Sequence, residues 1–91
     1  MKAPKNITLV KASYIGACKY QFRFSNGIVQ ETDFEPIINY GESLKKFLDP
    51  KLFSKMKFNE FGDIYWGKNR DMSFYIDQYY GESQIVPSNQ K

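Results

Sequence analysis

The sequence contains no histidine, and this absence removes much of the common catalytic chemistry. It excludes Ser-His and Cys-His nucleophile pairs, imidazole general bases and every metal site that needs a histidine ligand. Phosphate-binding glycine loops, the dinucleotide-binding Gly-x-Gly-x-x-Gly motif and EF-hand spacing are absent as well. We therefore expect a protein that is not an enzyme and that uses no metal and no cofactor.

Cysteine and long apolar runs are also scarce. Cys18 is the only cysteine, so no disulfide can form within the chain, which suits a reducing cytoplasm. A lone cysteine is more often a small buried hydrophobic residue than a nucleophile. No segment approaches the ~20 apolar residues of a membrane span, and Lys11 interrupts the apolar run near the start, which argues against a signal peptide. We expect a cytoplasmic protein that does not contact membranes.

The formal net charge of +3 comes entirely from Lys2, Lys5 and Lys91, which lie in predicted tails. Residues 6–90 hold ten basic and ten acidic side chains, whereas nucleic-acid binding requires a contiguous basic face. Residues 1–30 nevertheless carry five basic and no acidic side chains. These basic side chains either lie on solvated strand faces or contact a nucleic acid. The candidate residues for such a contact are Lys11, Lys19 and Arg23.

A chain of 91 residues predicts one domain with a small core, to which an aromatic content of 18% contributes much of the buried surface. We predict a flexible N-terminus over residues 1–6, a single α+β domain over residues 7–80 and a flexible C-terminal tail over residues 81–91. The predicted fold is a small antiparallel sheet of three strands with short helices, a second hairpin and a C-terminal helix.

The clearest strand signal lies in residues 19–24, where polar and aromatic residues alternate without exception. A first strand is predicted over residues 7–13 and a return strand over residues 28–34, with turn residues at 25–27 between the second and third strands.

Two registers of this hairpin compete. A two-residue turn would place carboxylates on the aromatic face, whereas a three-residue turn with Gly27 in the left-handed bulge position places Lys19 opposite Asp33. We adopt the second register, because a slip of one residue would move the aromatic side chains to the wrong face.

The remaining elements are predicted to be short, and each is bounded by capping residues, prolines or glycines. They are a helix or turn over residues 35–40 with Asp33 as its cap, an ambiguous stretch over 43–48, a helix over 50–55 that begins at Asp49-Pro50, a hairpin of 56–59 with 63–66, and a helix over 74–80 with Ser73 as its cap.

The most informative stretch is residues 64–71, which joins the only tryptophan to a glycine, an amide and three charges. Strand alternation places Tyr65 and Trp66 on opposite faces, so Trp66 is either the main residue of the core or part of an aromatic-basic contact surface. The candidate partner-binding residues are Tyr65, Trp66, Lys68, Asn69, Arg70 and Asp71.

Two other charged sets have simpler interpretations. Asp63 and Asp71 flank the tryptophan strand, and turn and capping roles explain them better than a catalytic carboxylate pair. A lysine-dense middle is typical of a solvated face; it comprises Lys45, Lys46, Lys51, Lys55 and Lys57.

Four motifs occur in one order: Phe24-Ser25-Asn26-Gly27, Asp33-Phe34, Leu48-Asp49-Pro50 with Phe53, and Ile64-Tyr65-Trp66 with Asn69 and Asp71. Together they resemble a widespread bacterial family of small domains of unknown function, over roughly residues 7–80. The resemblance implies a compact α+β domain with no established catalytic residue. Some relatives are encoded beside another small domain, in an arrangement that looks like a toxin–antitoxin pair with this domain as the proposed antitoxin. The family's Asn-Gly after the tryptophan is Asn69-Arg70 here, with a glycine instead at Gly67.

These observations predict a small non-catalytic protein-interaction module, an antitoxin-like partner of a neighbouring small protein. The alternative is a weak nucleic-acid-binding or regulatory domain that uses the basic N-terminal hairpin. An exposed sheet edge would offer a further contact by strand addition. The sequence does not decide between a monomer and a homo-oligomer, because aromatic-rich small domains often complete their core in a dimer.

Overall fold

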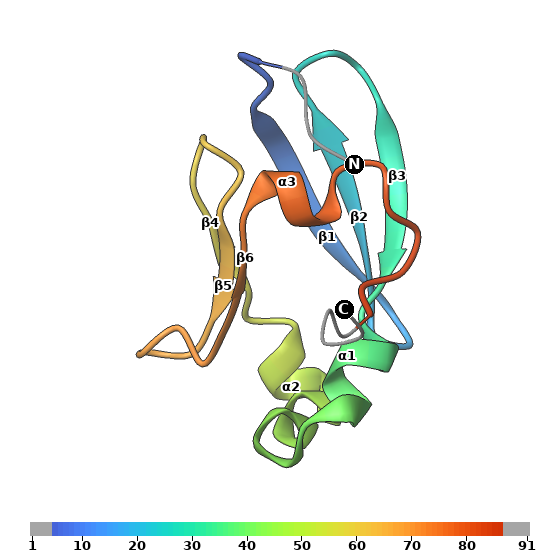
Figure 1. Cartoon of the computed structure of the whole chain (residues 1–91), viewed down its shortest axis with the longest axis vertical. Helices are drawn as coiled ribbons and strands as arrows, with labels where there is room; N and C mark the ends of the chain where they lie inside the picture. Colours follow the sequence, from blue (N-terminus) through green and yellow to red (C-terminus); the bar gives the residue numbers. More distant parts are fainter. Residues whose placement is uncertain (1–4, 87–91) are drawn as a thin grey trace.

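The computed structural model describes residues 5–86 and confirms the predicted α+β fold (Figure 1). The first antiparallel sheet has the strand order β1-β2-β3 and the second has the order β4-β5-β6. The strands are β1 (Leu9–Gly16), β2 (Lys19–Phe24), β3 (Val29–Asp33), β4 (Lys57–Phe58), β5 (Ile64–Trp66) and β6 (Met72–Phe74). The helical segments are α1 (Glu35–Tyr40), the 3-10 helix η1 (Glu42–Leu48), α2 (Pro50–Phe53) and α3 (Ile76–Tyr79).

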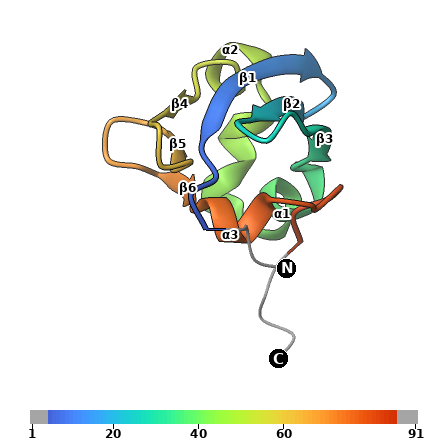
Figure 2. The same cartoon turned by 90° about the horizontal axis from the view of Figure 1, so that it is seen from above.

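The two sheets lie on opposite sides of a shared core. In Figure 1 the helical segment between β3 and β4 occupies one end of the molecule, and α3 crosses between the sheets. In the view from above, α3 and α2 lie on opposite sides, and β1 begins beside α3 (Figure 2). Each sheet therefore presents one face to the aromatic core and the other to solvent.

The register of the first hairpin is the one predicted. Lys19 pairs with Asp33, the amide of Phe24 donates to the carbonyl oxygen of Ile28 at 2.9 Å, and Gly27 has φ +88°. This is the bulged three-residue turn, and it directs Tyr20, Phe22 and Phe24 of β2 into the core. The hydrophobic pattern decides the register, because a slip of one residue would place the carboxylates of Glu31 and Asp33 opposite these rings, on the aromatic face.

The predicted helix over residues 74–80 is wrong at its start. Ser73 is not a cap but the central residue of β6, where it pairs with Tyr65. The helix α3 begins only after Tyr75, whose amide donates to Oε1 of Gln78 at 2.7 Å. Met72 is buried on the inner face of β6, so pairing with β5 outweighs the local capping signal.

The other short elements differ from prediction only at their ends. Oδ1 of Asp49 accepts from the amide of Lys51 at 2.9 Å, and α2 ends at Phe53 rather than at residue 55. The prediction that Asp33 caps α1 is wrong by one residue, because Phe34 is the N-cap; Oδ1 of Asp33 accepts from the amide of Glu35 at 2.9 Å and closes the turn before the helix. The ambiguous stretch is the 3-10 helix η1, and the first strand runs from Leu9 to Gly16.

The segment after α3 is packed, which corrects the prediction of a loose tail from residue 81. The amide of Asp33 donates to the carbonyl oxygen of Ser83, and the amide of Ile85 donates to the carbonyl oxygen of Asp33, both at 2.9 Å. Gln84 forms a parallel bridge to Asp33, and Ile85 is buried. The segment therefore covers part of the outer edge of β3, while residues 1–4 and 87–91 of the predicted tails lie outside the described residues.

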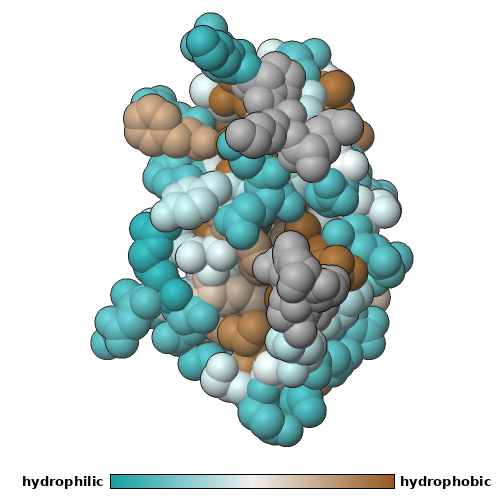
Figure 3. Space-filling model, in the orientation of Figure 1, coloured by the Kyte–Doolittle hydropathy of each residue, from teal (hydrophilic) through white to brown (hydrophobic). Residues whose placement is uncertain are grey.

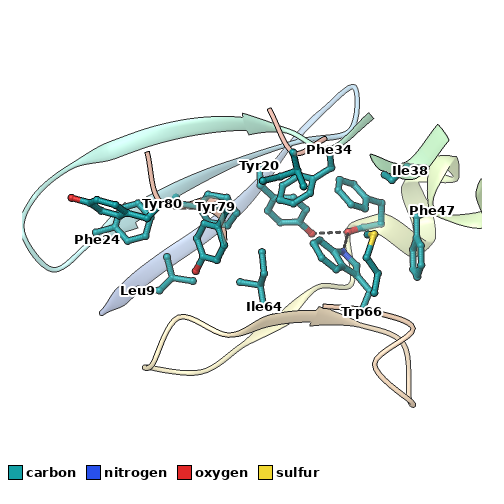
Figure 4. Close-up of a cluster of buried hydrophobic side chains, with 14 residues drawn as sticks. Leu9, Tyr20, Phe24, Phe34, Ile38, Phe47, Ile64, Trp66, Tyr79 and Tyr80 are labelled. Carbon is teal, nitrogen blue, oxygen red and sulfur yellow. Dashed lines mark hydrogen bonds between the residues drawn. The ribbon is translucent and has the colours of Figure 1, made fainter. Parts of the chain in front are cut away.

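Trp66 is the central residue of the core and is 1% exposed. Its ring stacks on Phe53 with 5.1 Å between centroids and 7° between planes. Its Nε1 donates to the carbonyl oxygen of Phe53 at 2.8 Å, and the hydroxyl of Tyr20 donates to the same oxygen at 2.6 Å (Figure 4). The prediction that Trp66 is a partner-binding residue is corrected, because a partner cannot reach it in this structure.

Burial of the Tyr20 hydroxyl makes the free energy of unfolding sensitive to pH in the alkaline range. Desolvation raises the pKa of Tyr20 from 10 to about 12, so the folded state keeps a proton that the unfolded chain loses between these values. We expect the free energy of unfolding to be unaffected by this group below pH 10 and to fall by on the order of 2 kcal/mol as the pH rises toward 12. Denaturant titrations over this range measure the fall, which Tyr20→Phe should reduce; a flat profile would contradict it.

Candidate functional site

The turn between β5 and β6 is fixed to η1. Gly67 has φ +88°, and a Cβ there would lie 2.5 Å from Oδ2 of Asp71, so the carboxylate packs directly on the glycine. The same Oδ2 accepts from Nζ of Lys46 at 2.9 Å. This ion pair holds the turn against η1 and neutralises Lys46 locally.

Arg70 lies over the ring of Tyr65, with its guanidinium carbon 4.3 Å from the ring centroid. Tyr65 belongs to the outer face of β5, opposite Lys57 of β4. Cation–π contacts of this kind contribute about 0.5–1 kcal/mol at exposed sites, enough to orient the arginine. Arg70 has φ +55°, a conformation that glycine adopts without strain.

Two adjoining depressions lie beside this turn. One, of about 140 Å³, is lined by Lys46, Phe47, Leu52, Lys55, Gly67 and Asp71. The other, of about 260 Å³, is lined by Lys55, Lys57, Tyr65, Gly67 and Lys68. They share Lys55 and Gly67, and we refer to all the residues that line them as the basic cleft.

Charge is segregated toward this end of the molecule. Residues 45–57 and 65–71 carry seven basic and two acidic side chains, whereas the other described residues carry four basic and eight acidic ones. Within residues 5–86, no ion pair engages Lys55, Lys57 or Lys68. Figure 3 shows hydrophilic groups projecting at the β5–β6 turn. The cleft therefore has a positive charge that this part of the chain does not neutralise, which favours an anionic partner.

The structure brings most of the candidate partner-binding residues to one surface. Tyr65, Lys68, Arg70 and Asp71 lie in or beside the basic cleft, and Asn69 is exposed in the turn. Only Trp66 lies elsewhere, in the core.

The sequence interpretation missed three contributors from the lysine-dense middle, which are Lys46, Lys55 and Lys57. The predicted hairpin carried a signal for one of them, because pairing residues 56–59 with 63–66 sets Lys57 near Tyr65. Of the remaining lysines in that run, Lys45 pairs with Glu42 at 3.3 Å and Lys51 is exposed on α2.

The candidate nucleic-acid residues share the solvent face of the first sheet. Lys11 is the direct cross-strand partner of Arg23, so two of them form a basic pair. Lys19 instead lies opposite Asp33, and both line a depression of about 310 Å³ that also contains Glu31. The carboxylates of Glu31 and Asp33 therefore interrupt the basic surface where it reaches β3.

Three further features offer fewer reactive or charged groups. A hollow of about 250 Å³ lies between α1, β6, α3 and the segment after α3, with Ile37, Phe74 and Ile85 among its lining residues (Figure 3). Cys18 is half-buried in the turn between β1 and β2, and burial raises the pKa of its thiol, which lowers its reactivity. Asp63 exchanges hydrogen bonds with Asn59 in the β4–β5 turn, the local role expected of it.

Across residues 5–86, no cluster of three or more acidic or cysteine side chains is arranged to hold a metal ion. In the same part of the chain, no helix has the length and hydropathy needed to cross a membrane. No family model, curated protein or solved structure matches the chain. The basic cleft is thus defined by its own geometry and charge.

Proposed function

We propose that this chain is a small non-catalytic protein-interaction module that binds its partner through the basic cleft. The observation that carries the proposal is the convergence of Lys55 and Lys57 with Lys68 and the Arg70–Tyr65 stack beside the β5–β6 turn, which the ion pair of Lys46 with Asp71 joins to η1. Pre-oriented arginine and tyrosine side chains are typical of the residues that dominate protein–protein binding energy.

The resemblance to small bacterial domains supports a more specific version, in which the partner is a small neighbouring protein and this chain acts as its antitoxin. An antitoxin of this kind acts by occupying a surface and needs no catalytic group of its own. A single half-buried cysteine suits such a role in the cytoplasm.

A second candidate function is weak nucleic-acid binding through the solvent face of β1 and β2. The cross-strand pair of Lys11 and Arg23 favours it, because two adjacent cations can contact successive phosphates. It predicts an affinity that falls with salt by a log–log slope of about one per phosphate contact.

The proposal is tested by affinity capture from the native host lysate at about 0.1 M salt, with and without nuclease. We expect one small protein in near-equal amount that survives nuclease. The double variant Lys68→Glu/Arg70→Glu should weaken its binding by ~100-fold or more, since close charge pairs across interfaces couple by about 1.5–7 kcal/mol. The melting temperature should fall by only a few degrees, because both side chains are exposed and the only stabilising contact that the described residues lose is that of Arg70 with Tyr65.

The matched control is Lys11→Glu/Arg23→Glu, which makes the same charge change on the first sheet. Unchanged partner binding by the Lys68/Arg70 variant would reject the basic cleft as the contact surface. A capture signal that disappears with nuclease, and with the Lys11/Arg23 variant, would support the nucleic-acid function instead.

A further inference from the structure

The two depressions of the basic cleft have different chemistry. Phe47 is 3% exposed and forms the floor of the smaller one, and Leu52, which is 38% exposed, forms part of its wall. The ammonium group of Lys46 is bound by Asp71, so the charge nearest this floor is already neutralised. At about 140 Å³ the depression is several times the ~30 Å³ share of one water molecule, which makes it the size of one aliphatic side chain.

The larger depression carries positive charge that no ion pair of the described residues neutralises. Lys55, Lys57 and Lys68 line it, and no ion pair within the described part of the chain engages them. Lysine is a compact, strongly hydrated cation on a flexible stem, so three of them adapt to carboxylates at several positions. This depression suits anionic side chains, immediately beside an apolar one.

From this juxtaposition we infer the chemistry of the partner, an inference that rests on the proposed function. The segment that enters the basic cleft is a stretch of polypeptide with one aliphatic side chain, which occupies the smaller depression, and at least two neighbouring carboxylates, which contact the lysines of the larger one. Lys55 and Gly67 line both depressions, so a short continuous segment reaches both.

Two features favour an acidic polypeptide over a nucleic acid. A nucleic-acid strand has no aliphatic side chain for the depression over Phe47. Strands without sequence preference also need free aromatic faces for base stacking, and one face of Tyr65 is covered by Arg70.

The test is fluorescence polarisation with synthetic peptides of about 12 residues at about 0.1 M salt. The first peptide is rich in Asp and Glu and has one central Leu; the second has Ser in place of Leu; the third has Asn and Gln in place of the acids. We expect the first to bind, the second to bind roughly 5- to 30-fold more weakly, and the third not to bind.

Variants of the protein locate the binding. Lys55→Glu/Lys57→Glu should remove binding of the first peptide, and Leu52→Asp should remove its advantage over the second. Lys51→Glu is the matched control, because it reverses a charge on α2 outside both depressions and should leave binding within about twofold.

Three results would overturn the inference. They are equal binding of the first and second peptides, absence of binding by the first peptide, and tighter binding of a single-stranded oligonucleotide of about 12 nucleotides to the same lysines. If lysate capture still recovers a protein through Lys68 and Arg70, the proposed function stands and only the stated chemistry fails. If capture also fails, both are rejected.

Discussion

Replacing Trp66 with alanine is expected to lower the free energy of unfolding by about 3–5 kcal/mol, roughly half of the ~5–10 kcal/mol available to a domain of this size. Trp66 contacts the rings of Tyr20, Phe34, Phe47, Phe53 and Phe74, so its removal leaves a cavity where both sheets and the helical segment meet. It also removes the indole N–H from the carbonyl oxygen of Phe53. Urea titration monitored by circular dichroism measures the change.

Two control variants separate the causes. Trp66→Phe keeps an aromatic ring on Phe53 but loses the hydrogen bond, and should cost roughly half as much as the alanine variant. Phe61→Ala removes an aromatic side chain that is 70% exposed, and should change stability by no more than about 0.5 kcal/mol. Equal effects of Trp66→Ala and Phe61→Ala would show that Trp66 is not the centre of the core.

Replacing Gly62 with alanine is expected to cost about 2–5 kcal/mol, from two sources that add. Gly62 has φ +90°, where a Cβ costs roughly 1–2 kcal/mol in backbone strain. That Cβ would also lie 2.6 Å from Cβ and 2.7 Å from Cδ1 of Ile76, so α3 or the β4–β5 turn must move, at a further ~1–3 kcal/mol.

Gly27 supplies a matched control for the steric part of this prediction. Its φ is +88°, nearly that of Gly62, but nothing lies within 4 Å of a Cβ built on it. Gly27→Ala should therefore lose only the backbone contribution of about 1–2 kcal/mol. Thermal melts of the two variants compare them directly. Equal destabilisation by Gly62→Ala and Gly27→Ala would mean that Ile76 moves without loss of stability and that α3 is not packed against the β4–β5 turn.

Local sequence patterns were sufficient to predict the elements whose structure depends only on one hairpin or one helix cap. The alternation in β2 and the glycine at position 27 are sufficient to select between the two registers of this hairpin. The Asp-Pro signal likewise gave the start of α2.

The predictions were wrong where contacts with a distant segment determine the local structure. Ser73 reads locally as a helix cap, yet pairing with Tyr65 makes it a strand residue. The segment around Ile85 has few apolar residues, and only the open edge of β3 explains why it is ordered. Both outcomes depend on long-range hydrogen bonds that a local window does not contain.

The basic cleft illustrates the same limit for function. The sequence pointed to Tyr65, Lys68 and Arg70 because they are close to one another in the chain. Lys55 and Lys57 precede them by about ten residues and join them only because β4 pairs with β5 and α2 lies beside the turn. Trp66, the most conspicuous residue of the stretch, serves the core instead.

The most direct test of the basic cleft as the contact surface is backbone amide shift mapping of the isotope-labelled protein during titration with the captured partner. We expect the largest shift changes in residues 55–57 and 65–71, with little change on the solvent face of β1 and β2. Changes concentrated at Lys11, Lys19 and Arg23, or in the hollow around Ile37 and Phe74, would contradict the basic cleft as the binding surface.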